Sequence, residues 1–155
     1  VVVDVDDEPL RRASKVPGVV LMPNVDELSR LAGSSCASLA DVAVAAQGLL
    51  LGGAAGVVVT RGPDGMVALT SDRGWSAQLD GPLTGNPTGA GDAAAAAVIR
   101  GLAAGHSWPD LLRDAAAMSA AAVVAPVAGH VDVHVNDELI RRVVVSTVPV
   151  PSGAT

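Results

Sequence analysis

Short valine-rich runs recur along the chain, and stretches with helical signals separate them. The first three runs, "VVVDV", "GVVLM" and "GVVVTRG", begin at residues 1, 18 and 56, and we expect each to form a strand. Helices are expected between them, at residues 8–14, 24–33 and 38–51. Strands that alternate with helices are typical of an α/β layered fold with a mostly parallel sheet.

The second half of the chain predicts further elements of both kinds. Strands at 66–71 and 75–79, joined by a turn at Asp72–Gly74, should lie antiparallel at one edge of the sheet. Helices are expected at about 91–104, 109–125 and 136–142, followed by a strand at 143–146. The stretch "GHVDVHV" (129–135) alternates like a strand, and Pro149 and Pro151 mark a frayed tail over 149–155.

A buried parallel strand needs a neighbouring strand on both of its edges. The run at residues 1–5 stands at the very start of the sequence. We therefore expect that a preceding part of the fold belongs beside it, either in the same chain or supplied separately.

The composition limits both the core and the partners. Phe and Tyr are absent and Trp occurs at 75 and 108 alone, so Ala, Val and Leu must fill a closely packed core. A net charge of −6 without a large basic cluster argues against nucleic acid or an anionic membrane as the main partner. A local anion site remains open, because backbone N–H groups can form one.

Other features exclude several classes of site. Cys36 is the single cysteine, so no internal disulfide can form, which fits a reducing cytoplasm. His106, His130 and His134 lack the spacing of metal ligands. Residues 42–60 carry no charge, but glycines break the stretch, so we expect a helix end and a strand there and no membrane span. No basic segment typical of a signal peptide opens the sequence.

The stretch "NPTGAGD" (86–92) places a carboxylate where a glycine turn becomes an alanine-rich helix. Gly89 and Gly91 free the backbone to turn, and Asp92 falls at the helix start. The first turn of a helix has unpaired N–H groups and partial positive charge, which favour a phosphate. A simple Asp cap explains the same pattern, so both interpretations stay open.

Two further motifs have a structural and a functional interpretation. "NVDE" (24–27) is a capping box, or else Asn24 and Glu27 are oxygen ligands of a hydrated Mg²⁺. "TRGPDG" (60–65) is a turn, or else a loop at a strand end where a nucleotide lies.

In this order, the three motifs resemble those of the ribokinase/PfkB family of sugar kinases. The resemblance covers nearly the whole chain and matches the carboxyl-terminal half of a family member, which would make residues 1–148 that half of a ribokinase-like kinase domain. The amino-terminal half, with the sugar pocket and lid, would be absent. Within the family, the motifs look nearest to the 1-phosphofructokinase and tagatose-6-phosphate kinase branch, and adenosine kinase and other branches stay open.

The resemblance implies a role for each motif. Asp92 would be the catalytic base, and the N–H groups of Gly89, Ala90 and Gly91 would form an anion hole for the transferred phosphoryl group. ATP would lie beside Thr60, Gly62 and Gly65, while Asn24 and Glu27 would orient Mg²⁺ through water. The expected partners are ATP, a sugar or sugar phosphate and the amino-terminal half, with a homodimer as an open option.

Some positions depart from the family pattern. Met22 stands where a Lys often precedes Pro-Asn, and Asn86 stands where Asp is common, which weakens the case for a monovalent-cation site. Ala93 and Ala94 replace a bulky residue that usually follows the base. The favoured function is an ATP-dependent, cytoplasmic carbohydrate kinase. The alternatives are a non-catalytic kinase fragment that binds a nucleotide or a partner, and a dinucleotide-binding domain, which lacks the expected G-x-G-x-x-G.

Overall fold

The computed structural model describes residues 1–151, so the last four residues of the predicted tail lie outside the described part. Six strands form one sheet in the order β1-β2-β3-β4-β5-β6. The chain divides into two compact units. The first comprises Val1–Arg61, Val67–Trp75 and the described residues from Thr147 onward, and the second comprises Gly62–Met66 and Ser76–Ser146.

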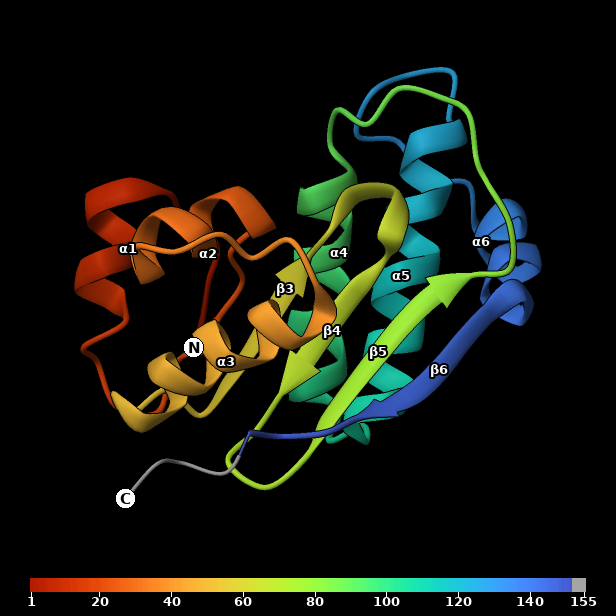
Figure 1. The fold of residues 1–155 in the computed structure, drawn as a ribbon. Coiled ribbons are helices and arrows are strands. Elements are labelled where there is room, and N and C mark those ends of the chain that lie inside the picture. The colour runs from red at the N-terminus through yellow and green to blue at the C-terminus, as the bar shows by residue number, and fades with distance from the viewer. Residues whose placement is uncertain (152–155) are drawn as a thin grey trace. The chain divides into compact units, whose positions relative to one another are not determined.

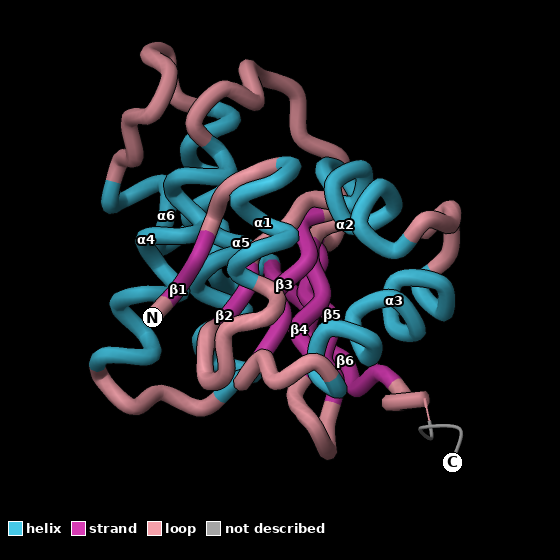
Figure 2. Tube along the Cα trace, turned by 90° about the vertical axis from the view of Figure 1, so that its left-hand side faces the viewer, coloured by secondary structure: helices cyan, strands magenta, loops and turns pink. Residues whose placement is uncertain are grey.

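The first unit alternates parallel strands with helices, as the sequence predicts (Figures 1 and 2). Its elements are β1 (Val2–Val3), α1 (Asp7–Ala13), β2 (Val20–Leu21), α2 (Val25–Ala32), α3 (Leu39–Leu51) and β3 (Gly56–Thr60). β2 pairs in parallel with β1 and with β3. Val57, Val58 and Val59 of β3 have 0% exposure, which is the burial expected of an interior strand covered on both faces.

The prediction for the first strand needs a correction. β1 spans two residues, both half-buried, and stands first in the strand order with β2 as its partner. An edge position leaves one side of the strand without the neighbour that would complete its burial. β2 is also shorter than the predicted 18–22, since its regular pairing covers Val20 and Leu21.

Capping explains why the first helices begin and end where the sequence predicts. Ser38 accepts a hydrogen bond from the Asp41 N–H at the start of α3, and the Asp41 carboxylate accepts one from the Ser38 N–H. Both hydrogen bonds with Ser38, first that of its hydroxyl, lower the pKa of Asp41. α2 ends at Gly33, whose φ of 70° is the left-handed conformation of a helix C-cap.

The strands after β3 form the antiparallel part of the sheet. β4 (Met66–Leu69) and β5 (Gly74–Leu79) are joined by a tight turn in which the Thr70 N–H donates to the Arg73 carbonyl. β6 (Val143–Val148) runs antiparallel to β5: Gly74 lies against Val148, and the Asp80 N–H donates to the Arg142 carbonyl at the other end. This arrangement confirms the antiparallel strands expected at one edge.

Small residues allow the helices of the second unit to pack closely. α4 (Ala90–Ala103) and α5 (Trp108–Val124) lie side by side (Figure 1). Ala94, Ala97 and Ala117 have 0% exposure. A Cβ on Gly101 would lie 3.1 Å from Leu111 Cγ, so the glycine brings the two helices into direct contact. The aromatic-poor core therefore packs closely, as predicted, and glycine as well as alanine allows the close approach.

The helix near the end of the chain starts earlier than predicted. α6 spans Val133–Leu139 and continues as the 3-10 turn η2 (Ile140–Arg142). The strand-like interpretation of 129–135 is therefore wrong, because no strand forms there and its last three residues are helical. A helix forms here despite the strand-like alternation of apolar and polar residues. The Asp132 carboxylate starts the helix, because it accepts hydrogen bonds from the N–H groups of His134 and Val135. The bonds from Val135 and His134 lower the pKa of Asp132.

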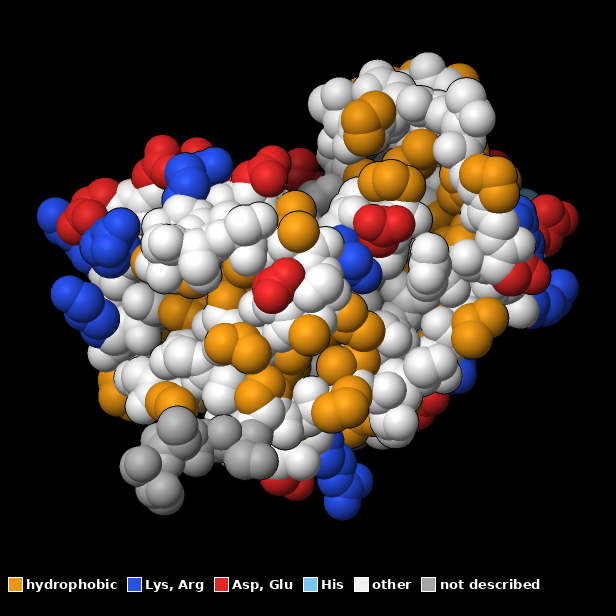
Figure 3. All heavy atoms as spheres, viewed as in Figure 1, with side chains coloured by type: hydrophobic (Ala, Val, Ile, Leu, Met, Phe, Trp, Pro, Cys, Tyr) orange, Lys and Arg blue, Asp and Glu red, His pale blue; other side chains and the backbone are white. Residues whose placement is uncertain are grey.

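The uncharged stretch 42–60 resolves into α3, a turn and β3, and no helix within residues 1–151 is long and apolar enough to cross a membrane. Charged side chains instead gather over α1 and α2 (Figure 3), where Glu8 pairs with Arg11 and Arg12 and Asp7 pairs with Arg30.

A pair of substitutions one residue apart tests the close packing of α4. We expect Ala97→Leu to lower the free energy of unfolding by about 1–3 kcal/mol, because the buried site has no room for three more carbons. Ala96→Leu makes the same chemical change at an exposed position of the same helix and should change stability by less than about 0.5 kcal/mol. Chemical denaturation of both variants measures the difference, and equal stabilities would contradict close packing.

Candidate active site

Asn24 and Glu27 form the capping box of α2. Asn24 Oδ1 accepts hydrogen bonds from the N–H groups of Asp26 (3.0 Å) and Glu27 (2.9 Å). Glu27 Oε2 accepts one from the Asn24 N–H at 2.8 Å. The structural interpretation of "NVDE" is therefore realised, and the spacing of the two residues alone is no evidence of a metal site.

The position of this capping box beside the strand ends is stronger evidence for a ligand site than the spacing of its residues. Asn24 stands after β2 and forms an isolated parallel bridge with Thr60, the last residue of β3. The Thr60 N–H donates to the Pro23 carbonyl at 3.1 Å. The structure thus brings Asn24, Glu27 and Thr60 to the carboxyl ends of two adjacent parallel strands. Open α/β sheets bind ligands at such strand ends.

The loop after Thr60 has the geometry of a tight turn. Residues 62–64 form the 3-10 turn η1, and the Gly65 N–H donates to the Gly62 carbonyl at 3.1 Å. Gly62 and Gly65 both have positive φ, 58° and 77°. A Cβ on Gly65 would lie 2.1 Å from the Ala77 carbonyl oxygen of β5, so only glycine fits there.

The stretch 86–92 forms a turn that leads into α4, as predicted. Gly89 is the N-cap, with a φ of 86°, and Asp92 lies exposed in the first helical turn. The Thr88 N–H donates to Asn86 Oδ1, and the Ala90 N–H donates to the Pro87 carbonyl at 3.1 Å. Of the three expected anion donors, Ala90 is thus engaged within the turn. Among residues 1–151, the N–H groups of Gly89 and Gly91 join no backbone hydrogen bond.

A segment that the sequence analysis did not single out supports this turn. The Asn86 N–H donates to the Val123 carbonyl at 2.9 Å and so caps the last turn of α5. A Cβ on Gly85 would lie 1.9 Å from the same oxygen, and one on Gly89 would lie 2.6 Å from Gly129 Cα. Glycines therefore let the turn rest directly on the backbone of residues 123–129. This contact joins residues about forty positions apart in the sequence, and the only signal of it was the glycines themselves.

The described residues suit Mg²⁺ held mainly by water and phosphate. Among residues 1–151, no group of three His, Cys, Asp or Glu side chains could hold a metal ion. Mg²⁺ usually keeps several waters and takes one or two carboxylates together with substrate phosphates. The single carboxylate of Glu27, beside the Asn24 amide, fits that manner of binding.

The sequence profile of the pfkB family carbohydrate kinases matches residues 14–132. The chain belongs to this family. The match includes all three motifs, and a dinucleotide-binding domain is therefore set aside.

Solved structures of sugar kinases have the same fold. Phosphofructokinase-2 from Escherichia coli in complex with potassium is 26% identical, with a TM-score of 0.85 over 90% of this chain and 46% of that chain. Ribokinase from Arabidopsis thaliana, complexed with ribose and ATP, is 26% identical, with a TM-score of 0.71 over 79% of this chain and 40% of that chain. The chain thus spans about half the length of these kinases.

Substitutions at two glycines of the turn test its geometry. We expect Gly89→Ala to lower the free energy of unfolding by about 1–3 kcal/mol, because the residue has positive φ and its Cβ would overlap Gly129. At Gly91, where a Cβ meets nothing within 4 Å, alanine should leave stability unchanged or raise it by up to about 1 kcal/mol. Thermal and urea unfolding report both values, and a Gly89→Ala protein as stable as Gly91→Ala would refute this geometry.

Proposed function

We propose that the chain is the nucleotide-binding and catalytic part of a kinase that phosphorylates a hydroxyl of a sugar or sugar phosphate with ATP. The observation that carries the proposal is the glycine turn 86–92, which places the Asp92 carboxylate in the first turn of a long helix. A helix N-terminus attracts phosphate, and a carboxylate beside it can accept a proton from an attacking hydroxyl. Membership in a family of carbohydrate kinases supports the same chemistry.

In the proposed reaction, Asp92 accepts the proton of the sugar hydroxyl. The hydroxyl oxygen forms a bond to the γ-phosphorus of ATP, and the bond between that phosphorus and the β–γ bridging oxygen breaks to release ADP. N–H groups at Gly89, Ala90 and Gly91 stabilise the charge on the transferred group. The Ala90 N–H would exchange its bond to the Pro87 carbonyl for one to phosphate, whereas those of Gly89 and Gly91 need no such exchange.

The nucleotide is proposed to lie along the strand-end loop that contains Thr60, Gly62 and Gly65. The conformation of this loop supports the proposal, because two glycines with positive φ keep it compact and leave it without bulky side chains at those positions. Asn24 and Glu27 would orient Mg²⁺ through water, and the metal would neutralise part of the phosphate charge. Thr60 and Asn24 already meet in a parallel bridge, which puts both proposed roles at one pair of strand ends.

The sugar side of the reaction is proposed to come from an amino-terminal half of the kinase. The chain spans about half the length of the related kinases, and β1 ends the strand order with β2 as its partner. A further strand paired to the open side of β1 would complete the burial of Val2 and Val3. Homodimer formation and a cytoplasmic location stay predictions.

The observation that the chain spans about half the length of the related kinases also favours a second function. A chain with half of the kinase fold could bind a nucleotide or a partner chain without catalysing transfer. The retained Asp92 and its glycine turn support the enzyme instead, since nucleotide binding alone does not require a base. Turnover distinguishes the two functions.

We expect Asp92→Asn to reduce turnover by roughly 10²–10⁴-fold in an enzyme that combines this chain with the amino-terminal half, because the proton acceptor is lost. Stability should change little, since Asn suits a helix start about as well as Asp. ATP affinity should persist, because the proposed anion donors belong to the backbone. Coupled ADP release, assayed over a panel of free sugars and sugar phosphates, measures the turnover.

Asp110→Asn is the matched control, because Asp110 is also the third residue of its helix and lies exposed in the first turn of α5. Its turnover should equal that of the wild type. Normal turnover in Asp92→Asn would reduce Asp92 to a helix-capping residue. A wild-type enzyme that binds ATP but transfers phosphate to no sugar of the panel would favour the non-catalytic function.

A further inference from the structure

The carboxyl ends of β1, β2 and β3 differ in charge. Asp4 and Asp6 lie after β1, and Met22, Pro23 and Asn24 follow β2. Arg61 directly follows β3. Because the three strands are parallel, their ends meet at one edge of the sheet. In the segments 4–6, 22–24 and 61, Arg61 is the one basic residue.

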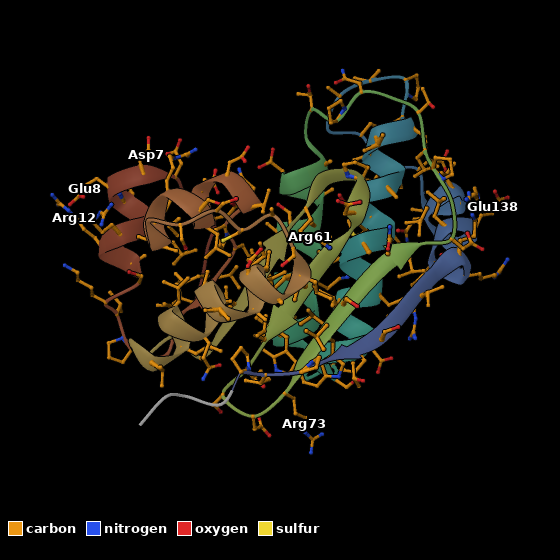
Figure 4. All side chains as sticks on the ribbon, viewed as in Figure 1. Asp7, Glu8, Arg12, Arg61, Arg73 and Glu138 are labelled. Atoms are coloured by element: carbon orange, nitrogen blue, oxygen red, sulfur yellow. The ribbon has the colours of Figure 1, made fainter. Side chains whose placement is uncertain are left out.

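The basic side chains on the helices beside these strands form ion pairs with acidic side chains of α1. Arg11 and Arg12 pair with Glu8 on α1, and Arg30 of α2 pairs with Asp7 at 3.3 Å. Figure 4 shows Asp7, Glu8 and Arg12 together on α1, with Arg61 well apart from them. These arginines stand on α1 and α2, so Arg61 differs from them in its position directly after β3.

The position of Arg61 is set by strand pairing. Thr60, the last residue of β3, is bridged to Asn24, so Arg61 follows directly beside the start of α2. The Arg61 residue is half-buried, which restricts its motion more than that of a fully exposed arginine. It already takes part in an interaction within the protein. A guanidinium group has five N–H donors, however, which allows it to bind phosphate oxygens as well.

We infer that Arg61 binds the phosphate chain of the nucleotide and sets the preference of this site for nucleotides over nucleosides. The inference rests on the proposed nucleotide site and adds a residue to it. ATP brings several negative charges to an edge that already holds Asp4, Asp6 and Glu27, and backbone N–H groups supply only partial charges. Arginine keeps its full charge and can bind phosphate through two parallel hydrogen bonds.

Calorimetric titration of the purified chain with ATP, ADP and adenosine, in the presence of Mg²⁺, tests the inference. Arg61→Gln should weaken ATP and ADP binding about 10- to 100-fold, as expected for the loss of a charge-assisted hydrogen bond. Adenosine affinity should stay unchanged, because adenosine has no phosphate. Arg61→Lys should recover part of the loss, since it keeps the charge without the planar fork.

Arg73→Gln is the matched control. Arg73 lies in the β4–β5 turn, its side chain is 73% exposed, and it pairs with the adjacent Asp72 (Figure 4). This variant makes the same change in net charge away from β3, so its ATP affinity should equal that of the wild type. Raised salt should weaken ATP binding less in Arg61→Gln than in the wild type, because one screened charge is gone.

The outcomes separate this inference from the proposed function. Equal ATP affinity of the wild type and Arg61→Gln would overturn the role of Arg61 and leave the nucleotide site standing. Equal losses of ATP and adenosine affinity, or a marked fall in melting temperature, would make Arg61 a structural residue and would also overturn the inference. A wild-type chain that binds neither ATP nor ADP would overturn both the inference and the nucleotide site.

Discussion

A core without phenylalanine or tyrosine requires backbones to approach one another closely. Alanine and valine fill little space, so burial is complete only where neighbouring elements touch. Glycine marks the closest of these contacts: Gly101 faces Leu111 between α4 and α5, and Gly89 faces Gly129. The second contact belongs to the candidate site. The close packing that stabilises the second unit therefore also positions the turn that carries Asp92.

The candidate site combines structural and functional roles in the same residues. Asn24 and Glu27 start α2 through reciprocal hydrogen bonds, and Gly65 lacks the Cβ that would overlap the Ala77 carbonyl oxygen. These structural roles alone would account for the presence of each residue, without any ligand. Their common position supports a function: Asn24 and Thr60 end adjacent parallel strands, where α/β folds place their ligands. The structural roles fix the backbone, and a fixed backbone is what phosphoryl transfer requires.

Local signals predicted the parts of the fold that local interactions determine. The capping box at Asn24 and the turn at Gly89 lie within a few residues of the helices they begin, and both are confirmed. The length and burial of β1 depend on neighbouring strands. The valines at its start therefore predicted a longer and more deeply buried strand than the structure shows. The alternation before α6 was likewise overridden by the Asp132 cap. The support of the turn by residues 123–129 is a long-range contact, and the sequence alone gave no register for it. The roles of Asp92, Thr60 and Glu27 in catalysis and binding stay predictions.

Hydrogen exchange of the backbone amides, with and without saturating Mg²⁺ and ATP, tests the central claim most directly. The account predicts slower exchange at residues 60–65 and at the turn 89–91, where phosphate would bind N–H groups. α6 should be unaffected, because no nucleotide contact is proposed there. Unchanged exchange at 60–65 and 89–91 under saturating Mg²⁺ and ATP would contradict the account.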